Sequence, residues 1–307
     1  MSGHVPTVVI GTDGSPDSER ALHYGALEAA RAGCGITLVH VTPDYVPIAA
    51  MYPVAMSEME QQGRYILDQS AETLRRWAPD APVQSLLRVG RRVGAVSEAG
   101  RGARMIVLGH RHASMMTRLS TGTTTTGVAA RATAPVVSVP ATWNPEVEHG
   151  LVIAGFKGAA HSGELLARAF AAASARKAKL VVMHAWRLPT AYDDVVEGRV
   201  HAEEWARAAH EEIDPLLEDW HRSYPDVEVE VRVLHDHPAH ALREASKEAD
   251  LMVLVRKSHG FPAAVHLGSV ARTLLRDSVC PVAIVPPQAV AAETPGLVLE
   301  DEGTMQK

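Results

Sequence analysis

The sequence of this chain repeats itself at a nearly constant offset. Gly155 stands 144 residues after Gly11, and Pro281 stands 146 residues after Pro135. The stretch around Ala249–Leu254 likewise repeats Ala103–Leu108. Self-similarity at a fixed spacing over several segments indicates a duplicated structural unit. We therefore expect one fold that occurs twice in the same chain.

The duplication sets the expected domain boundaries. We assign the first domain to residues 1–141, a polar linker to 142–150 and the second domain to 151–288. The remaining residues, 289–307, are expected to form a disordered tail. A total of 307 residues agrees with two domains of roughly 150 residues each.

Each unit alternates strand patterns with helix patterns. Thr7–Ile10 has the composition of a buried strand, and the turn after it offers Ser15 as a helix cap with Pro16 at the first helical position. Gly33 is expected to end that helix. Alternating strands and helices favour an α/β fold, in which each domain is a doubly wound, parallel sheet.

Three further elements of the first domain are less sharply bounded. A strand is predicted over Val83–Val89, and helices are predicted over Glu58–Trp77 and Ala95–Arg101. The segment Asp44–Met56 follows Pro43 and contains Pro47 and Pro53, so we interpret it as an irregular, mobile flap.

Composition excludes several classes of protein. The formal net charge is −6, which gives no electrostatic footprint for nucleic acid, and Arg88, Arg91 and Arg92 are interpreted as a solvated loop. No apolar run reaches the ~18 residues of a membrane helix. The N-terminus lacks a signal-peptide pattern. Cys34 and Cys280 occupy non-equivalent places in the two units, so we expect no disulfide and a cytoplasmic location.

One loop of the first unit has the composition of a phosphate-binding site. The strand Met105–Leu108 runs into Gly109, and Gly122 precedes a run of threonines at the start of a helix pattern. Glycines allow close approach to the backbone, threonine hydroxyls can bond phosphate oxygens, and a helix N-terminus favours an anion. An ordinary loop between a strand and a helix would have a similar composition, so both interpretations stay open on these residues alone.

Taken together, the motifs resemble the universal stress protein family. The matching stretches are Ile10–Pro16, Leu38–Val41 and the pattern from Gly109 through His112 and Gly122 to Pro135. The resemblance covers nearly the whole chain as two tandem domains. It implies a five-stranded α/β fold related to nucleotide-binding α-hydrolases. Family dimers pair their last strands, which here implies that Val136–Val139 faces Val282–Val285 within the chain, and it also suggests a homodimer.

Some family members bind ATP, and the resemblance implies a site for it here, with Mg²⁺ accompanying the phosphates. Asp13 would contact the adenosine portion, the Val41 backbone would read the adenine edge, and Leu108 would line the ribose. An alternative role for Asp13 is to stabilise its own turn. The complete set of expected nucleotide-binding residues is Thr12, Asp13, Val41, Leu108, Gly109, His112, Gly122, Thr123 and Thr124.

Both units depart from the family pattern. In the first unit His112 replaces a glycine, and this side chain could obstruct the ligand or itself meet a phosphate. In the second unit Lys157 replaces the aspartate, and only Gly268 and Ser269 remain of the loop. The helix cap of the first unit has no counterpart at Ala159. We therefore predict weak or absent nucleotide binding by the second domain.

Three functional hypotheses follow from these residues. The first is an adenine-nucleotide-binding regulatory protein of the stress response, and the second is an interaction module that has abandoned nucleotide. A slow ATPase ranks last, because no residue stands out as a base for an attacking water, so no catalytic residues are assigned. No metal site is expected either, since zinc needs three or four convergent ligands and His110, His235, His237 and His240 are interpreted as surface residues.

Overall fold

A computed structural model describes most of the chain. It covers residues 6–44, 53–110, 123–160, 162–188, 191–256 and 267–287, and only the backbone is described for 53–55, 123, 191–200 and 202. The predicted tail, most of the predicted flap, and His112 and Gly122 lie outside the described residues.

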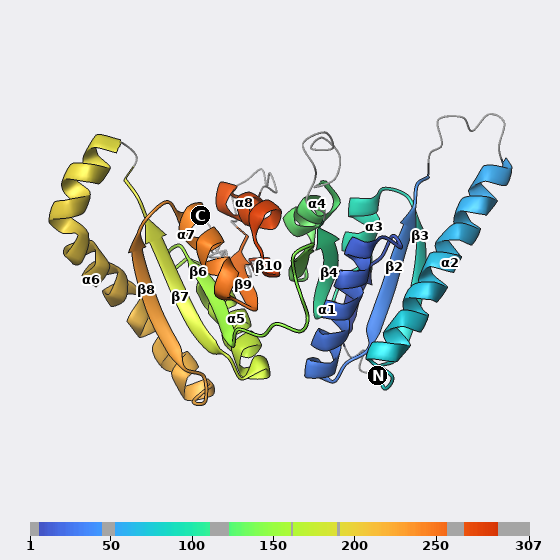
Figure 1. Ribbon diagram of the computed structural model, residues 1–307, viewed down its shortest axis with the longest axis horizontal. Coiled ribbons are helices and arrows are strands. Elements are labelled where there is room, and N and C mark those ends of the chain that lie inside the picture. Colours follow the sequence, from blue (N-terminus) through green and yellow to red (C-terminus); the bar gives the residue numbers. More distant parts are fainter. Residues whose placement is uncertain are drawn as a thin grey trace, which may run out of the picture.

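The strands of both halves form one sheet (Figure 1). In the first half they are β1 (Val8–Gly11), β2 (Ile36–Thr42), β3 (Val83–Val89), β4 (Met105–His110) and β5 (Val136–Pro140). In the second half they are β6 (Leu151–Phe156), β7 (Lys179–Trp186), β8 (Val229–His235), β9 (Leu251–Val255) and β10 (Val282–Val285). Their spatial order is β3-β2-β1-β4-β5-β10-β9-β6-β7-β8, so the second half repeats the topology of the first.

The two halves join through their last strands. Neighbouring strands are parallel within each half, but β5 and β10 are antiparallel, with Val137 opposite Ala283 and Val136 opposite Ile284. The predicted pairing of these two strands is confirmed. The predicted α/β class is confirmed as well, and the sheet is continuous from one half to the other.

Helices cover both faces of this sheet. One apolar core contains residues of α1 (Pro16–Ala32), α2 (Pro53–Trp77), α5 (Ser162–Arg176) and α6 (Ala191–Ser223). The other contains residues of α3 (Arg92–Ala99), α4 (Thr123–Arg131), α7 (Pro238–Ala245) and α8 (Ser269–Asp277), and a short 3₁₀ turn, η2 (Ser246–Glu248), follows α7. Within the described residues, no helix is both long and apolar enough to cross a bilayer.

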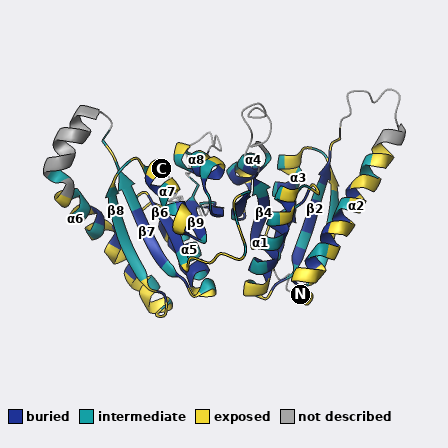
Figure 2. Cartoon of the chain, viewed as in Figure 1, coloured by how far each residue is buried: buried dark blue, intermediate teal, exposed yellow. Residues whose placement is uncertain are grey.

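Each strand contributes side chains to both cores, because successive residues point to opposite faces of the sheet. Val8 and Ile10 of β1 point into the core under α1, whereas Val9 between them points to the opposite face. This alternation is the two-residue period of a strand. Figure 2 shows the result, with buried strands at the centre and exposed residues along the outer sides of the helices.

The predicted cap residues at both ends of α1 are confirmed. Ser15 accepts the backbone N–H of Ser18 at 3.3 Å, Pro16 is the first helical residue, and Gly33 closes the helix in the left-handed conformation at φ 57°. Such a cap satisfies backbone groups that a helix end leaves without partners.

Two predicted helix boundaries were wrong. Helix α2 begins at Pro53 and not at Glu58, because proline is tolerated in a first helical turn. Helix α3 runs from Arg92 to Ala99 and not from Ala95 to Arg101. Its early start follows from Gly90, whose φ of 133° turns the chain directly out of β3.

Candidate functional site

A pocket of about 420 Å³ opens at the carboxyl ends of β1, β2 and β4. In the first half the strand order is β3-β2-β1-β4-β5, so the connections run in opposite directions on the two sides of the β1–β4 pair. Open α/β sheets bind ligands at such a switch point, outside the carboxyl ends of the strands. The topology therefore makes this pocket the first candidate for a binding site.

Six of the expected residues line this pocket, and they come from distant parts of the sequence: Thr12, Asp13, Val41, Leu108, Gly109 and Thr124. Thr123 is the first residue of α4 and so stands beside Thr124. His112 and Gly122 lie outside the described residues. The weaker candidates Gly268 and Ser269 form the corresponding helix start in the second half, where Gly268 is the N-cap of α8.

Thr12 is a framework residue of the pocket. Its hydroxyl lies 3.0 Å from Ser70 Oγ and donates to Ser18 Oγ at 3.3 Å, so it ties the β1 turn to α1 and α2. Its backbone N–H donates to the Val39 carbonyl at 2.9 Å. Because these groups are already engaged inside the protein, Thr12 shapes the pocket wall through its position.

His40 is a pocket residue that the sequence-based assignment missed. Its Nδ1 lies 2.8 Å from the carbonyl oxygen of Thr12. A carbonyl oxygen only accepts, so Nδ1 carries the proton in this contact. The same contact recurs in the second half, where His184 Nδ1 lies 3.3 Å from the Phe156 carbonyl oxygen. The sequence did contain a signal for this residue, because a histidine recurs at His184, 144 residues after His40.

Asp13 stabilises the turn after β1. Its Oδ1 accepts the backbone N–H of Ser15 at 3.0 Å and also the Ser15 hydroxyl. This is the turn-forming role considered for Asp13 from the sequence. Asp17, in the first turn of α1, is a second carboxylate that lines the pocket, and it pairs with Arg20.

Gly109 serves packing inside the protein. A Cβ on this residue would lie 2.2 Å from the carbonyl oxygen of Asp17. Gly109 also lines the pocket, as expected, but the nearest neighbour of its missing Cβ is the first turn of α1. Thr125 also bonds this residue, donating from Oγ1 to the Gly109 carbonyl at 3.2 Å.

Positive charge reaches the pocket from two helix starts. Thr124 lies in the first turn of α4, and Arg92 is the first residue of α3. Helix N-termini favour anions, and a guanidinium adds a full positive charge. Arg92 and its neighbours were expected to form a solvated loop. All three arginines are exposed, as expected, but Arg88 lies in β3, and Arg92 lies at the start of α3, where it also lines the pocket.

Aromatic rings occupy the matching edge of the second half. Phe156 stands at the place of Thr12, is buried, and meets the ring of His184 edge-on at 6.0 Å. Trp186 stands at the place of Thr42 and stacks on His235 at 4.1 Å. Trp205 of α6 closes against Trp186 edge-to-face at 4.5 Å. These rings replace the hydroxyl groups of the first half.

Among the described residues, no group of three or more His, Cys, Asp or Glu side chains could hold a metal ion. Mg²⁺ commonly binds through one or two carboxylates together with substrate phosphates. Asp13 and Asp17 are the pocket carboxylates that fit that mode. Both cysteines are free and buried, and burial raises the pKa of the Cys280 thiol to about 12.

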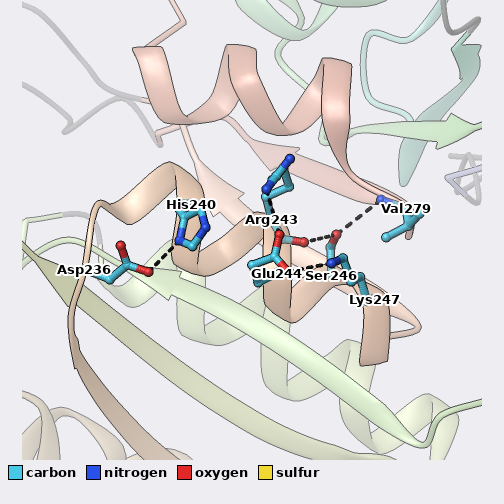
Figure 3. A network of polar contacts seen from close by, with 7 residues as sticks. All are labelled: Asp236, His240, Arg243, Glu244, Ser246, Lys247 and Val279. Carbon is cyan, nitrogen blue, oxygen red and sulfur yellow. Dashed lines mark hydrogen bonds and ion pairs between the residues drawn. The ribbon is translucent and has the colours of Figure 1, made fainter.

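His240, one of the clustered histidines of the second half, takes part in polar contacts around α7 (Figure 3). His240 Nδ1 lies 2.7 Å from Asp236 Oδ2. Burial alone would raise the pKa of Asp236, but hydrogen bonds from His240 and from the His237 backbone bring it below its usual value. Ser246 Oγ accepts the Val279 N–H at 3.2 Å, which joins α7 to the segment before β10.

The repeated α/β unit, with a pocket at the switch point of its first copy, defines a tandem protein built from two copies of one open α/β fold. The model of the Universal stress protein family matches residues 5–140 and again residues 151–286. The chain therefore belongs to the universal stress protein family.

Relatives match along most of the chain. Universal stress protein Rv2005c of Mycobacterium tuberculosis is 30% identical over 291 residues, covering 90% of this chain and 96% of that protein. A universal stress protein of Mycolicibacterium smegmatis is 28% identical over 288 residues, covering 92% and 97%. A crystal structure of a universal stress protein from Archaeoglobus fulgidus aligns with a TM-score of 0.66 at 17% identity, over 92% of this chain and 98% of that chain.

Two single-domain structures of the family hold an adenine nucleotide. One is a universal stress protein in complex with cAMP, with 23% identity and a TM-score of 0.35 over 44% of this chain and 96% of that chain. The other is the Archaeoglobus fulgidus protein in complex with dAMP, with 22% identity and a TM-score of 0.33 over 44% and 97%.

Proposed function

We propose that this chain is a regulatory universal stress protein that binds an adenine nucleotide in its first half. Binding would change the conformation of the pocket wall and thereby a surface that another component of the stress response reads. ATP is the nucleotide we put forward, with Mg²⁺ held between its phosphates and a pocket carboxylate.

The observation that carries this proposal is the pocket at the switch point. It has room for a nucleotide, with a volume of about 420 Å³, in the range of small-molecule sites. Apolar side chains of Val39, Val41 and Leu108 offer a wall for a base and sugar. Thr124 and Arg92 offer a hydroxyl and a positive charge for phosphates.

The aromatic edge of the second half supports binding by one half only. Phe156 and Trp186 are packed against rings of the protein itself. Val270 stands where the first half has Thr124, so the hydroxyl is missing as well. We therefore propose one nucleotide per chain, with the second half acting as a structural partner.

Equilibrium dialysis of the full chain against labelled ATP, AMP and adenosine tests this proposal. We expect saturable binding of ATP at one site per chain. Thr124→Val should weaken ATP binding by about 10- to 150-fold, because one hydrogen bond to a charged group contributes about 1.5–3 kcal/mol. The matched control is Val270→Ala in the second half, which should leave the affinity unchanged.

The outcomes separate the three functional hypotheses. Absence of saturable binding by the wild-type chain would reject the nucleotide site and leave the interaction module. Binding of two nucleotides per chain would reject the assignment to the first half. Release of inorganic phosphate that continues over time and is lost in Asp13→Ala would favour the ATPase.

A further inference from the structure

A small second cavity lies where the two halves meet. It has a volume of about 30 Å³ and lies between α1 and α5. Its floor includes Val137 and Ala283, which face each other across the β5–β10 pair. Four arginine side chains line it, and they come from both halves: Arg31, Arg104, Arg168 and Arg176.

One buried carboxylate serves two of these arginines. The Arg176 guanidinium donates to Glu28 Oε1 and, at 2.9 Å, to the Tyr24 hydroxyl. Arg31 Nη1 donates to the same Glu28 oxygen at 2.8 Å. Burial raises the pKa of Tyr24, and the charge of Glu28 raises it further. The tyrosine therefore stays neutral and adds no negative charge.

The other two arginines form no such ion pair, although the charge of Glu28 also acts on Arg168. Among the residues that the structure describes, no carboxylate lies within 4.0 Å of a side-chain nitrogen of Arg104 or Arg168. Asp250 acts on this cluster through its charge, but its oxygens accept the backbone N–H groups of His149 at 2.7 Å and Leu151 at 3.0 Å. The cavity wall is thus richer in positive than in negative charge.

This surplus is costly mainly at Arg168, which is half-buried, whereas Arg104 is exposed. Burial lowers the pKa of the Arg168 guanidinium, which reflects the loss of hydration around its charge. A buried charge without an opposite charge destabilises the fold, whereas a paired and hydrogen-bonded one is tolerated. A bound anion would supply the missing charge.

The size of the cavity limits what that anion can be. A single water needs about 10–15 Å³ of such volume, so the cavity holds only a small group. Guanidinium groups bind the paired oxygens of carboxylate and phosphate groups through parallel N–H donors. We propose that this interface cavity binds a small inorganic oxyanion of the phosphate class, held chiefly by Arg168 and Arg104. The inference does not depend on the nucleotide pocket.

Thermal unfolding of the full chain with increasing inorganic phosphate tests the proposal. Sodium chloride would keep the ionic strength constant, so that general screening does not change along the titration. We expect a saturable rise of the unfolding midpoint for the wild type. Arg168→Gln and Arg104→Gln should each weaken the apparent phosphate affinity at least tenfold. Arg101→Gln is the matched control, since Arg101 is exposed and pairs with Glu98, and it should behave as the wild type.

A third variant distinguishes this cavity from the nucleotide pocket. Thr124→Val should retain the full response to phosphate if the anion lies between α1 and α5. Loss of the response in Thr124→Val, an unchanged response in Arg168→Gln, or no saturable response in the wild type would each overturn the proposal. Should Arg168→Gln fail to fold, the same criterion applies to Arg104→Gln, whose side chain is more exposed.

Discussion

Arg256 of the second half donates from Nη1 to the carbonyl oxygen of Ala132 at 2.9 Å and to that of Ala129 at 3.0 Å. These carbonyls lie at the C-terminal end of α4, the helix whose first turn lines the pocket at the switch point. The last carbonyls of a helix lack partners within it and attract positive charge. The second half therefore supports a wall of the pocket in the first half.

We expect Arg256→Met to lower the free energy of unfolding by about 1.5–3 kcal/mol, the range for hydrogen bonds to charged groups. Methionine keeps much of the apolar stem but removes the donors. Urea denaturation measures the change. Arg276→Met is the control, because Arg276 pairs on the surface with Asp277, and it should cost less than about 1 kcal/mol. Equal losses for the two variants would contradict the role of Arg256.

We expect Arg92→Gln to weaken ATP binding by about tenfold while leaving adenosine binding unchanged, because a charge-assisted contact to phosphate would be lost. Isothermal titration with both ligands measures the difference. Arg91→Gln, one residue away and outside the pocket lining, is the matched control. Equal weakening of ATP and adenosine would show that Arg92 acts through the shape of the pocket and not through phosphate.

Two glycine substitutions should have opposite effects on stability. In Gly109→Ala the new Cβ would lie 2.2 Å from the Asp17 carbonyl oxygen, so we expect a loss of about 1–3 kcal/mol or more through overpacking. In Gly94→Ala, within α3, the new Cβ meets nothing within 4 Å, and we expect a gain of about 0.5–1 kcal/mol. Urea denaturation distinguishes the two, and a neutral Gly109→Ala would refute the packing argument.

His23 should make stability depend on pH. Its ring stacks on Trp77 at 4.4 Å, and burial lowers its pKa from 6.5. The unfolded chain then binds more protons than the folded chain as pH falls through that value, so the contribution of His23 is present above it and lost below it. His23→Phe keeps a ring against Trp77 without the titration. Its stability should fall less between pH 7.5 and 5.5 than that of the wild type, and equal slopes would contradict this assignment.

Most of the fold could be predicted because its signals are local or repeated. Ser15 and Gly33 bound α1 through caps that depend on a few neighbouring residues. The pairing of Val136–Val139 with Val282–Val285 came from the family resemblance together with the duplication. The predicted start of helix α2 was five residues too late, because the sequence does not distinguish a proline at a helix start from a proline in a loop.

The pocket was harder to predict because its wall is assembled from many elements. Arg92 is an exposed residue, and its place at the pocket depends on the turn at Gly90 that follows β3. The aromatic rings at Phe156, Trp186 and Trp205 come from β6, β7 and α6. Only the contacts of these rings in the folded chain show that aromatic side chains stand in the second half where the first half has hydroxyl groups.

The antiparallel seam between β5 and β10 has a consequence for how the protein behaves on dilution. Because both strands belong to one polypeptide, in which the segment 141–150 joins the two halves, their association is intramolecular and has a high effective concentration. Two identical first halves cannot meet at that seam unless the chain opens. Every folded molecule therefore pairs one first half with one second half at this seam, and this pairing does not depend on the protein concentration in the cell.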